Sequence, residues 1–164
     1  MKYVILFLQY LKEHQLFEYD DLAAKTDAAT ERFHTLAGDI QQTEAELSRV
    51  SDLMAAVVQY AKTRPAFDGY KAAKYSRKYL AEHEAELADY RAAKATMAEL
   101  LGGEKLPKMD VLKEKRRQLA ARKKALYLEY RKAQQDMREL VAVKGSVDHL
   151  HGLTDNQRNK EQAR

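Results

Sequence analysis

The chain has 164 residues, of which 45% are hydrophobic and 33% are charged, and it contains no cysteine and no tryptophan. The absence of cysteine excludes disulfides, CxxC redox pairs and thiolate metal sites, and it fits a reducing, cytoplasmic location. The net charge of +4 hides an asymmetry, because residues 1–60 carry five basic and ten acidic side chains whereas residues 61–164 carry 24 and 15. The second part of the chain therefore favours either an anionic partner or packing against the acidic part.

A dense apolar run, residues 3–11, opens the chain. This run is too short to span a bilayer and no small-residue cleavage site follows it, so neither a membrane segment nor a signal peptide is indicated. We predict a short helix over about residues 2–15 that packs on the end of a bundle. Its abrupt start, with no capping residue in front, is what we expect of a fragment of a longer protein.

The strongest pattern in the chain is a set of residues that recur at alternating steps of four and three. They are Leu22, Thr26, Ala29, Phe33, Leu36, Ile40, Thr43, Leu47, Val50, Met54, Val57 and Ala61. Ten of these twelve positions are apolar and none is charged, which predicts one long helix with a narrow apolar seam that a partner helix must cover. We place this helix over about residues 20–64, with Asp20 or Asp21 as its N-cap and its end before Pro65.

Two further helices are predicted from capping residues and heptad spacing. One runs over about residues 76–101, with Ser76 as its N-cap, and ends at Gly102-Gly103. The other covers about residues 108–149 and has an apolar residue every seven positions. These residues are Leu112, Leu119, Leu126, Ala133, Leu140 and Val147. The polar residues 152–164 have nothing to bury, and we expect a disordered tail there.

These elements predict an all-α fold, with residues 1–151 forming an elongated, antiparallel three-helix bundle that resembles a coiled coil. In this arrangement the first and last long helices run in the same direction, and the middle helix lies between them. The pattern does not decide between a closed bundle and a homodimer that shares the seam.

No constellation of residues for catalysis is present. The sequence has no glycine-rich phosphate loop, no HExxH motif and no nucleophile elbow. His149 and His151 have the spacing of a metal-binding pair, but on a helix they point about 200° apart. We therefore predict that the chain is not an enzyme and binds neither a cofactor nor a metal.

Basic side chains gather in two places. In the segment YKAAKYSRKYL, a helical register of 100° per residue puts four residues on one face, namely Lys71, Lys74, Tyr75 and Lys78. On the last helix, six basic residues fall between about 40° and 140° from Leu112, together with Tyr127 and with no acidic residue. This basic arc consists of Lys113, Arg116, Arg117, Lys124, Arg131 and Arg138.

The basic arc has two interpretations, and spacing alone leaves both open. It can flank the acidic first helix, as basic residues at the e and g positions do in coiled coils. It can instead contact the phosphate backbone of a nucleic acid, with the Lys71 segment as a second contact and Tyr75 available to stack on an unpaired base.

Three stretches of the sequence carry a resemblance to a known family. They are ERFHTLAGDIQ, VVQYAKTRPAFDGYKAAKYSRKYLAEHEAEL and KKALYLEYRKAQQDMRELVAVKGSVDHLHG. Over about residues 3–160 the chain resembles the C-terminal region of relaxases, the mobilisation proteins of conjugative and mobilisable elements in Firmicutes. The opening segment YVILFLQYLKEHQLFEYDDLAAK is similar to the part that follows the nuclease domain in those proteins.

The resemblance implies a function but no catalytic residue. Relaxases nick a transfer origin with a tyrosine, aided by a metal that histidines hold, and the domain that does so precedes the region matched here. We therefore expect a non-catalytic helical module that assists non-specific DNA binding or assembly of the transfer complex, with the nuclease domain or other transfer proteins as partners. The alternative is a coiled-coil scaffold or oligomerisation module that makes no contact with nucleic acid.

Overall fold

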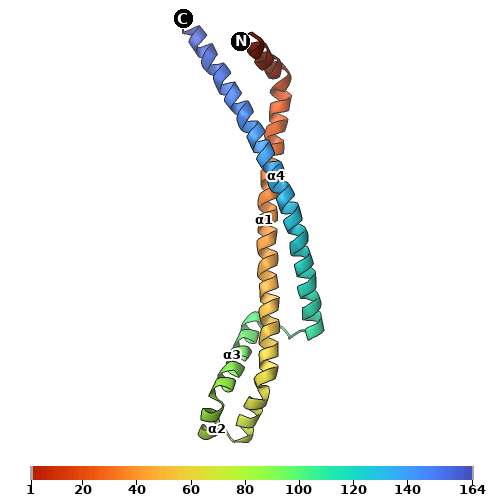
Figure 1. Ribbon diagram of the computed structural model, residues 1–164, viewed down its shortest axis with the longest axis vertical. Helices are drawn as coiled ribbons and strands as arrows, with labels where there is room; N and C mark the ends of the chain where they lie inside the picture. The colour runs from red at the N-terminus through yellow and green to blue at the C-terminus, as the bar shows by residue number, and fades with distance from the viewer. Residues whose placement is uncertain (1, 164) are drawn as a thin grey trace. The chain divides into compact units, whose positions relative to one another are not determined.

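The computed structural model describes the backbone of residues 2–163, and the side chains of all of these except residues 3–18 and 154. Four helices follow one another along the chain (Figure 1). They are α1 (Lys2–Ala72), α2 (Arg77–Glu82), α3 (Glu84–Leu101) and α4 (Met109–Gln162). The predicted all-α class, with long helices packed together, is confirmed. Among the described helices, none combines the length and the apolar character needed to cross a membrane.

The chain divides into two compact units, and α1 and α4 each contribute to both. Unit 1 consists of Met1–Ile40 and Ala125–Arg164, and unit 2 consists of Gln41–Lys124. Unit 1 is therefore a pairing of two helices, whereas unit 2 contains the end of α1, the whole of α2 and α3, and the start of α4.

In unit 1, α1 and α4 run antiparallel. Tyr19 on α1 is hydrogen-bonded to Asp148 on α4, while Phe33, further along α1, stacks on Tyr130 at a centroid distance of 4.9 Å. Residue numbers thus fall on α4 as they rise on α1. The prediction that the first and last long helices run in the same direction is wrong.

The cause of this error lies in unit 2. There α3 also runs antiparallel to α1, since Arg49 donates to the carbonyl of Leu100 and Gln59 donates to Asp89. The helix α4 pairs with α1 in the same sense, because Lys123 lies 3.3 Å from Glu44 while the earlier Leu112 packs in a cluster with the later Met54. The seven residues between α3 and α4 therefore do not reverse the chain, and the two helices run the same way beside α1.

The predicted apolar seam of α1 is buried over most of its length. Leu36, Ile40, Val50 and Met54 are each at most 7% exposed, and Thr43 is 1% exposed. In unit 2 the seam packs into a core that three helices share. This core contains Val50, Leu53, Met54, Leu112 and Leu119, with Leu47, Val57, Met97, Leu100, Leu101 and Met109 packed against it.

A second seam on α1, which the sequence analysis missed, faces α3. Its central contact is Tyr90 of α3, whose ring stacks on Tyr60 at 5.1 Å and on Phe67 at 4.4 Å. Thr63 lies between these two positions and is 4% exposed, whereas the predicted seam residue Ala61 is exposed. The buried face of α1 therefore rotates after Val57, because its partner changes from α4 to α3.

Helix α1 continues through both of its predicted ends. Residues 16–21 contain neither glycine nor proline, and an ion pair between Asp21 and Lys25 at 3.0 Å supports the helix there. The separate helix over residues 2–15 and the aspartate N-cap are thus corrected, while the predicted packing of that helix lies outside the described side chains. Pro65 also lies inside α1. It removes only the hydrogen bond to the carbonyl of Ala61, and Ala61 is exposed, so water can satisfy that carbonyl.

The other predicted boundaries also need correction. The helix expected over residues 76–101 is broken at His83, where φ is −123°, into α2 and α3. Its predicted end is confirmed, because Gly102 adopts the left-handed conformation with φ of 55°. Helix α4 does not stop at residue 149 but extends to Gln162. The expected disordered tail is rich in helix-forming Gln, Arg, Lys and Glu and has no proline, which explains the extension.

Candidate nucleic-acid interface

Four of the six residues of the basic arc lie in unit 2, on the solvent side of α4. Lys113, Arg116, Arg117 and Lys124 are exposed, whereas Leu112 and Leu119 are 3% and 7% exposed and pack into the three-helix core. The core therefore fixes the rotation of this part of α4 about its axis. Because the helix is held from the opposite side, the basic side chains project into solvent from a supported backbone.

One member of the arc is already paired. Arg117 donates from Nε and Nη2 to the two carboxylate oxygens of Glu114 at 2.9 and 2.7 Å. This bidentate contact, assisted by Gln118, lowers the pKa of Glu114 to about 2, and the same contact raises the pKa of Arg117. Helical angles place no acidic residue in the arc, but the side chain of Glu114 reaches Arg117 from outside it, because side chains three residues apart on a helix can meet.

The ion pairs that join α1 to α4 use residues outside the arc. In unit 2 the pair is Lys123–Glu44. In unit 1 it is Arg32–Glu129 at 3.8 Å, in which the acidic partner belongs to α4. Within the part of the chain that the structure describes, Lys113, Arg116 and Lys124 form no ion pair. The arc therefore contributes no ion pair between α4 and α1 among the described residues.

Unit 1 contains the remaining two arc residues, Arg131 and Arg138, and both are exposed. Tyr127, which shares the arc's register, is half-buried and meets the ring of Tyr130 edge-on at 6.3 Å. Tyr127 is thus partly covered and packs beside another ring of its own helix, so it is less accessible than the cations of the arc.

The second basic group does not lie on one helix face as predicted. Helix α1 ends at Ala72, so only Lys71 belongs to it, and Lys78 belongs to α2. Lys74 and Tyr75 lie in the turn between the two helices, with positive φ values of 53° and 60°. The physical reason is a close contact between α1 and α2 at Gly69, where an added Cβ would lie 2.2 Å from the hydroxyl of Tyr79.

The two basic groups of unit 2 are separated along α3. The turn after α1 lies beside the start of α2, whereas α4 follows the end of α3. The 18 residues of α3 rise by about 27 Å in total. The structure therefore does not merge the arc and the turn into one surface, and each is a separate candidate.

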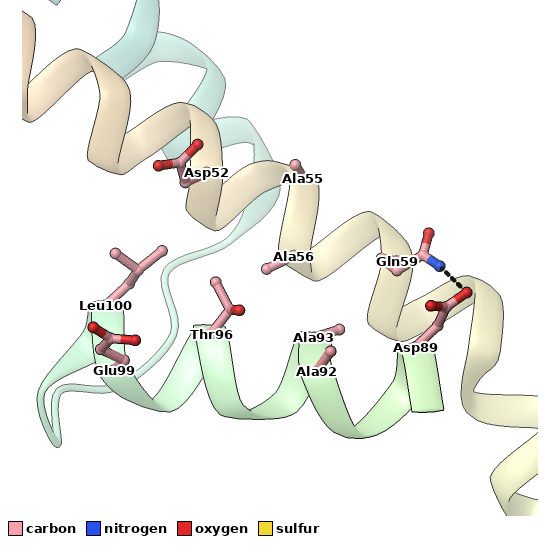
Figure 2. Close-up of a pocket in the computed structure, with 10 residues that line it drawn as sticks. All are labelled: Asp52, Ala55, Ala56, Gln59, Asp89, Ala92, Ala93, Thr96, Glu99 and Leu100. Carbon is pink, nitrogen blue, oxygen red and sulfur yellow. Dashed lines mark hydrogen bonds between the residues drawn. The ribbon is translucent and has the colours of Figure 1, made fainter. Parts of the chain in front are cut away.

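A shallow groove with a volume of about 660 Å³ lies between α1 and α3 in unit 2 (Figure 2). Ala56 and Ala93 line it, and the carboxylates of Asp52, Asp89 and Glu99 surround it. Three carboxylates repel a phosphate backbone. The groove therefore has the opposite charge from the arc and is not a candidate for the same ligand.

A polar cluster in unit 1 joins α1 to α4. The hydroxyl of Tyr19 donates to Asp148 Oδ1 at 2.5 Å, and Lys144 Nζ donates to Asp148 Oδ2 at 3.0 Å. These contacts lower the pKa of Asp148, and the hydrogen bond to Asp148 raises the pKa of both Tyr19 and Lys144. The ring of His151 lies 5.4 Å from that of Tyr19.

The sequence alone does not predict this cluster, because its formation depends on which turn of α4 lies opposite Tyr19. His149 and His151 both lie within α4, so the helical geometry that separates their rings applies. Among the described residues, no group of three or more His, Cys, Asp or Glu side chains is arranged to hold a metal ion.

No protein-family model, curated protein or solved structure matches the sequence.

Proposed function

We propose that this protein is a non-catalytic helical module that binds the phosphate backbone of DNA through the basic arc of unit 2. One observation carries the proposal. Lys113, Arg116 and Lys124 are exposed and make no ion pair among the described residues, while the pairing of α1 with α4 uses Lys123 and Glu129. Cations that the fold holds in one row without a partner are suited to a polyanion.

The proposed contact is electrostatic and independent of base sequence. Along α4, Arg116 lies three residues and Lys124 eleven residues after Lys113, which corresponds to rises of about 4.5 and 16 Å. Each Lys or Arg that neutralises a phosphate releases counterions, and this release supplies most of the binding free energy. Contacts to the phosphate backbone carry no base-sequence information, so we expect weak binding that falls steeply with salt.

The biological role that suits this contact is the one that the resemblance to relaxases suggests. In that role the module assists DNA engagement in the cytoplasm, beside a nuclease domain or other proteins of the transfer complex. The module itself would supply affinity, and the nicking chemistry would belong to its partner.

A scaffold function is the second candidate, and a specific observation favours it. Unit 1 leaves several large apolar side chains of α4 open to solvent, including Leu128 at 63%, Val143 at 51% and Val141 at 49% exposure. A two-helix pair cannot cover the whole circumference of either helix, and a second copy of the chain could cover more. Sedimentation equilibrium separates the two functions, because a scaffold of this kind is a dimer without DNA.

The direct test is fluorescence anisotropy with a labelled duplex oligonucleotide and two variants of equal net charge. The arc variant is Lys113→Gln/Arg116→Gln/Lys124→Gln. The matched control is Lys105→Gln/Lys115→Gln/Arg122→Gln, which removes three exposed basic residues of unit 2 outside the arc. We expect the parent and the control to bind with a Kd between about 1 and 100 μM.

The arc variant should bind much more weakly than the control, with unchanged helical circular dichroism. Equal loss in both variants would mean that net charge and not the arc attracts DNA. No binding by the parent below about 100 μM, the weak end of non-specific affinity, would favour the scaffold.

A further inference from the structure

The turn between α1 and α2 has an unusual backbone. Lys74 and Tyr75 are consecutive, neither is glycine, and both adopt the left-handed region with φ of 53° and 60°. Side chains with a Cβ rarely adopt this region because the Cβ approaches the following carbonyl. The turn is closed by hydrogen bonds from the amide of Tyr75 to the carbonyl of Tyr70 at 2.9 Å and from Ser76 to Ala73 at 3.2 Å.

Side-chain contacts of Tyr79 also hold this turn in place. The hydroxyl of Tyr79 donates to the carbonyl of Ala66 at 2.9 Å. Its ring stacks on His83 at 4.2 Å and lies 6.1 Å from Tyr70. Because Tyr79 already joins α2 to α1, the unfavourable backbone at Tyr75 is imposed by the surrounding fold. Unfavourable backbone that the surroundings impose is found most often at functional sites.

Tyr75 is the exposed aromatic residue of the turn. It is 57% exposed, whereas Tyr70 and Tyr79 are half-buried. Its ring meets Tyr70 edge-on at 5.2 Å with an interplanar angle of 85°. The ring is thus steadied by one neighbour while most of its surface remains accessible.

Basic residues flank Tyr75 along the chain, although Lys71 Nζ itself lies over the ring of Phe67, 5.7 Å from its centroid. Lys71, Lys74, Arg77 and Lys78 are all exposed, and the sequence has no acidic residue between Asp68 and Glu82. Asp68 itself lies 3.9 Å from Arg64. Arg77 was not among the predicted site residues, although it belongs to the same basic segment.

We infer that this turn binds single-stranded nucleic acid, with Tyr75 stacking on an unpaired base and the flanking basic residues contacting its phosphates. Single strands are bound by this combination of exposed aromatic rings and basic side chains, because every base offers a face to stack on. In a duplex the bases are already stacked, so Tyr75 adds nothing there. The inference deepens the proposed nucleic-acid function by assigning a strand type to a second site in unit 2.

An anionic membrane is the other ligand that a basic turn could attract. Membrane-surface binding needs an apolar face that enters the lipid. The turn offers one exposed ring, and Leu80, the nearest large aliphatic residue of α2, is half-buried. The observations therefore favour nucleic acid.

The test uses the full chain, a labelled oligothymidine strand and a labelled blunt duplex. Tyr75→Gly removes the ring and places the residue best suited to φ of 60°, so it should not lower the melting temperature. Tyr75→Phe keeps the ring. We expect Tyr75→Gly to weaken oligothymidine binding by roughly 5- to 150-fold, the loss measured for single stacking contacts. Tyr75→Phe should bind like the parent.

Two further readouts separate stacking from charge. Tyr75→Gly should leave the salt dependence of oligothymidine binding unchanged, because no phosphate contact is lost. Lys74→Gly, which also suits its backbone, should lower that slope by about 0.7. Neither variant should change duplex affinity.

The inference is overturned if Tyr75→Gly binds oligothymidine like the parent, or if vesicles containing phosphatidylserine bind the chain in a Tyr75-dependent way and oligothymidine does not. The arc variant keeps this result separate from the proposed function. If that variant binds duplex DNA normally while Tyr75→Gly still loses the single strand, the arc proposal fails and the inference stands. If the arc variant loses duplex binding and Tyr75→Gly has no effect, the arc proposal stands and the inference about Tyr75 fails.

Discussion

Units 1 and 2 use the same two long helices but bury them to different degrees. In unit 2 a third helix is present, and residues such as Leu87 and Thr43 reach 1% exposure. In unit 1, where α1 has only α4 as its partner, the stacked rings of Phe33 and Tyr130 remain half-buried. Unit 1 still buries Leu36, Ile40 and Ala133, which are 6%, 5% and 4% exposed, in the strip between its two helices. The third helix of unit 2 adds a second such strip.

Both units join their helices with polar contacts at the surface. In unit 1 these include Arg32–Glu129 and the Tyr19–Asp148 hydrogen bond, and in unit 2 they include Lys123–Glu44. Exposed contacts of this kind contribute little to stability. Unit 2 adds its apolar core, and among the described residues Lys113, Arg116 and Lys124 form no ion pair. The proposed binding surface is therefore carried by the better-packed unit.

The largest expected difference in stability between the two units comes from a charge placed in the core of unit 2. Leu87→Asp would bury a carboxylate where Leu87 is 1% exposed, at a cost of about 4 kcal/mol or more. The control is Leu128→Asp in unit 1, where Leu128 is 63% exposed. We expect thermal melting followed by circular dichroism to show a large loss for the first variant and almost none for the second. Equal melting temperatures would mean that the core of unit 2 is not as enclosed as described.

Two glycine substitutions, one in each unit, should change the free energy of unfolding in opposite directions. Gly69→Ala in unit 2 forces the hydroxyl of Tyr79 away from a Cβ that would lie 2.2 Å from it, and overpacking of this kind costs about 1–3 kcal/mol. Gly38→Ala in unit 1 meets nothing within 4 Å and should stabilise the helix by about 0.5–1 kcal/mol. Denaturant unfolding of both variants measures these changes. A gain in stability for Gly69→Ala would contradict the close contact between α1 and α2.

The sequence predicted the first seam well because its residues keep one helical period along α1. Leu36, Ile40 and Val50 repeat with the period of a coiled coil, and that period requires only a neighbour on one side. The second seam, which includes Tyr60 and Phe67, overlaps the first from Leu53 onward. Two overlapping seams widen the apolar face and hide the period of each.

Other features could not be predicted from local pattern. Proline normally ends a helix, but Pro65 removes only the hydrogen bond to the exposed residue Ala61, and Thr63 and Ala66 are buried on either side of it. The left-handed turn at Lys74 and Tyr75 contains neither glycine nor asparagine, the residues that favour this conformation, so the sequence does not predict it. In the arc, helical angles placed the cations correctly, but they could not show that Arg117 reaches Glu114.

The smallest expected effect concerns the polar cluster of unit 1. The pKa of Asp148 is lowered from its ordinary value of 3.8, so its contacts stabilise the folded state above that value and are lost as the pH falls through the folded pKa. The pKa of Tyr19 is raised above 10.0, so its contribution is present below pH 10 and is lost as the pH rises through its folded pKa.

We therefore expect the amides around Asp148 to exchange faster at both extremes than near neutral pH, after correction for intrinsic exchange rates. Asp148→Asn should remove the dependence at low pH. The amides around Leu87 in unit 2 serve as the control. Protection around Asp148 that does not change across the acid range would contradict the role of the cluster.

The most direct test of the central claim is the salt dependence of duplex DNA binding. If Lys113, Arg116 and Lys124 each neutralise one phosphate, a plot of log K against log salt concentration should have a slope of about −2.7. The arc variant should bring this slope close to zero, while the matched control should keep it. A slope that is the same for the parent and the arc variant would show that the basic arc of α4 does not bind DNA.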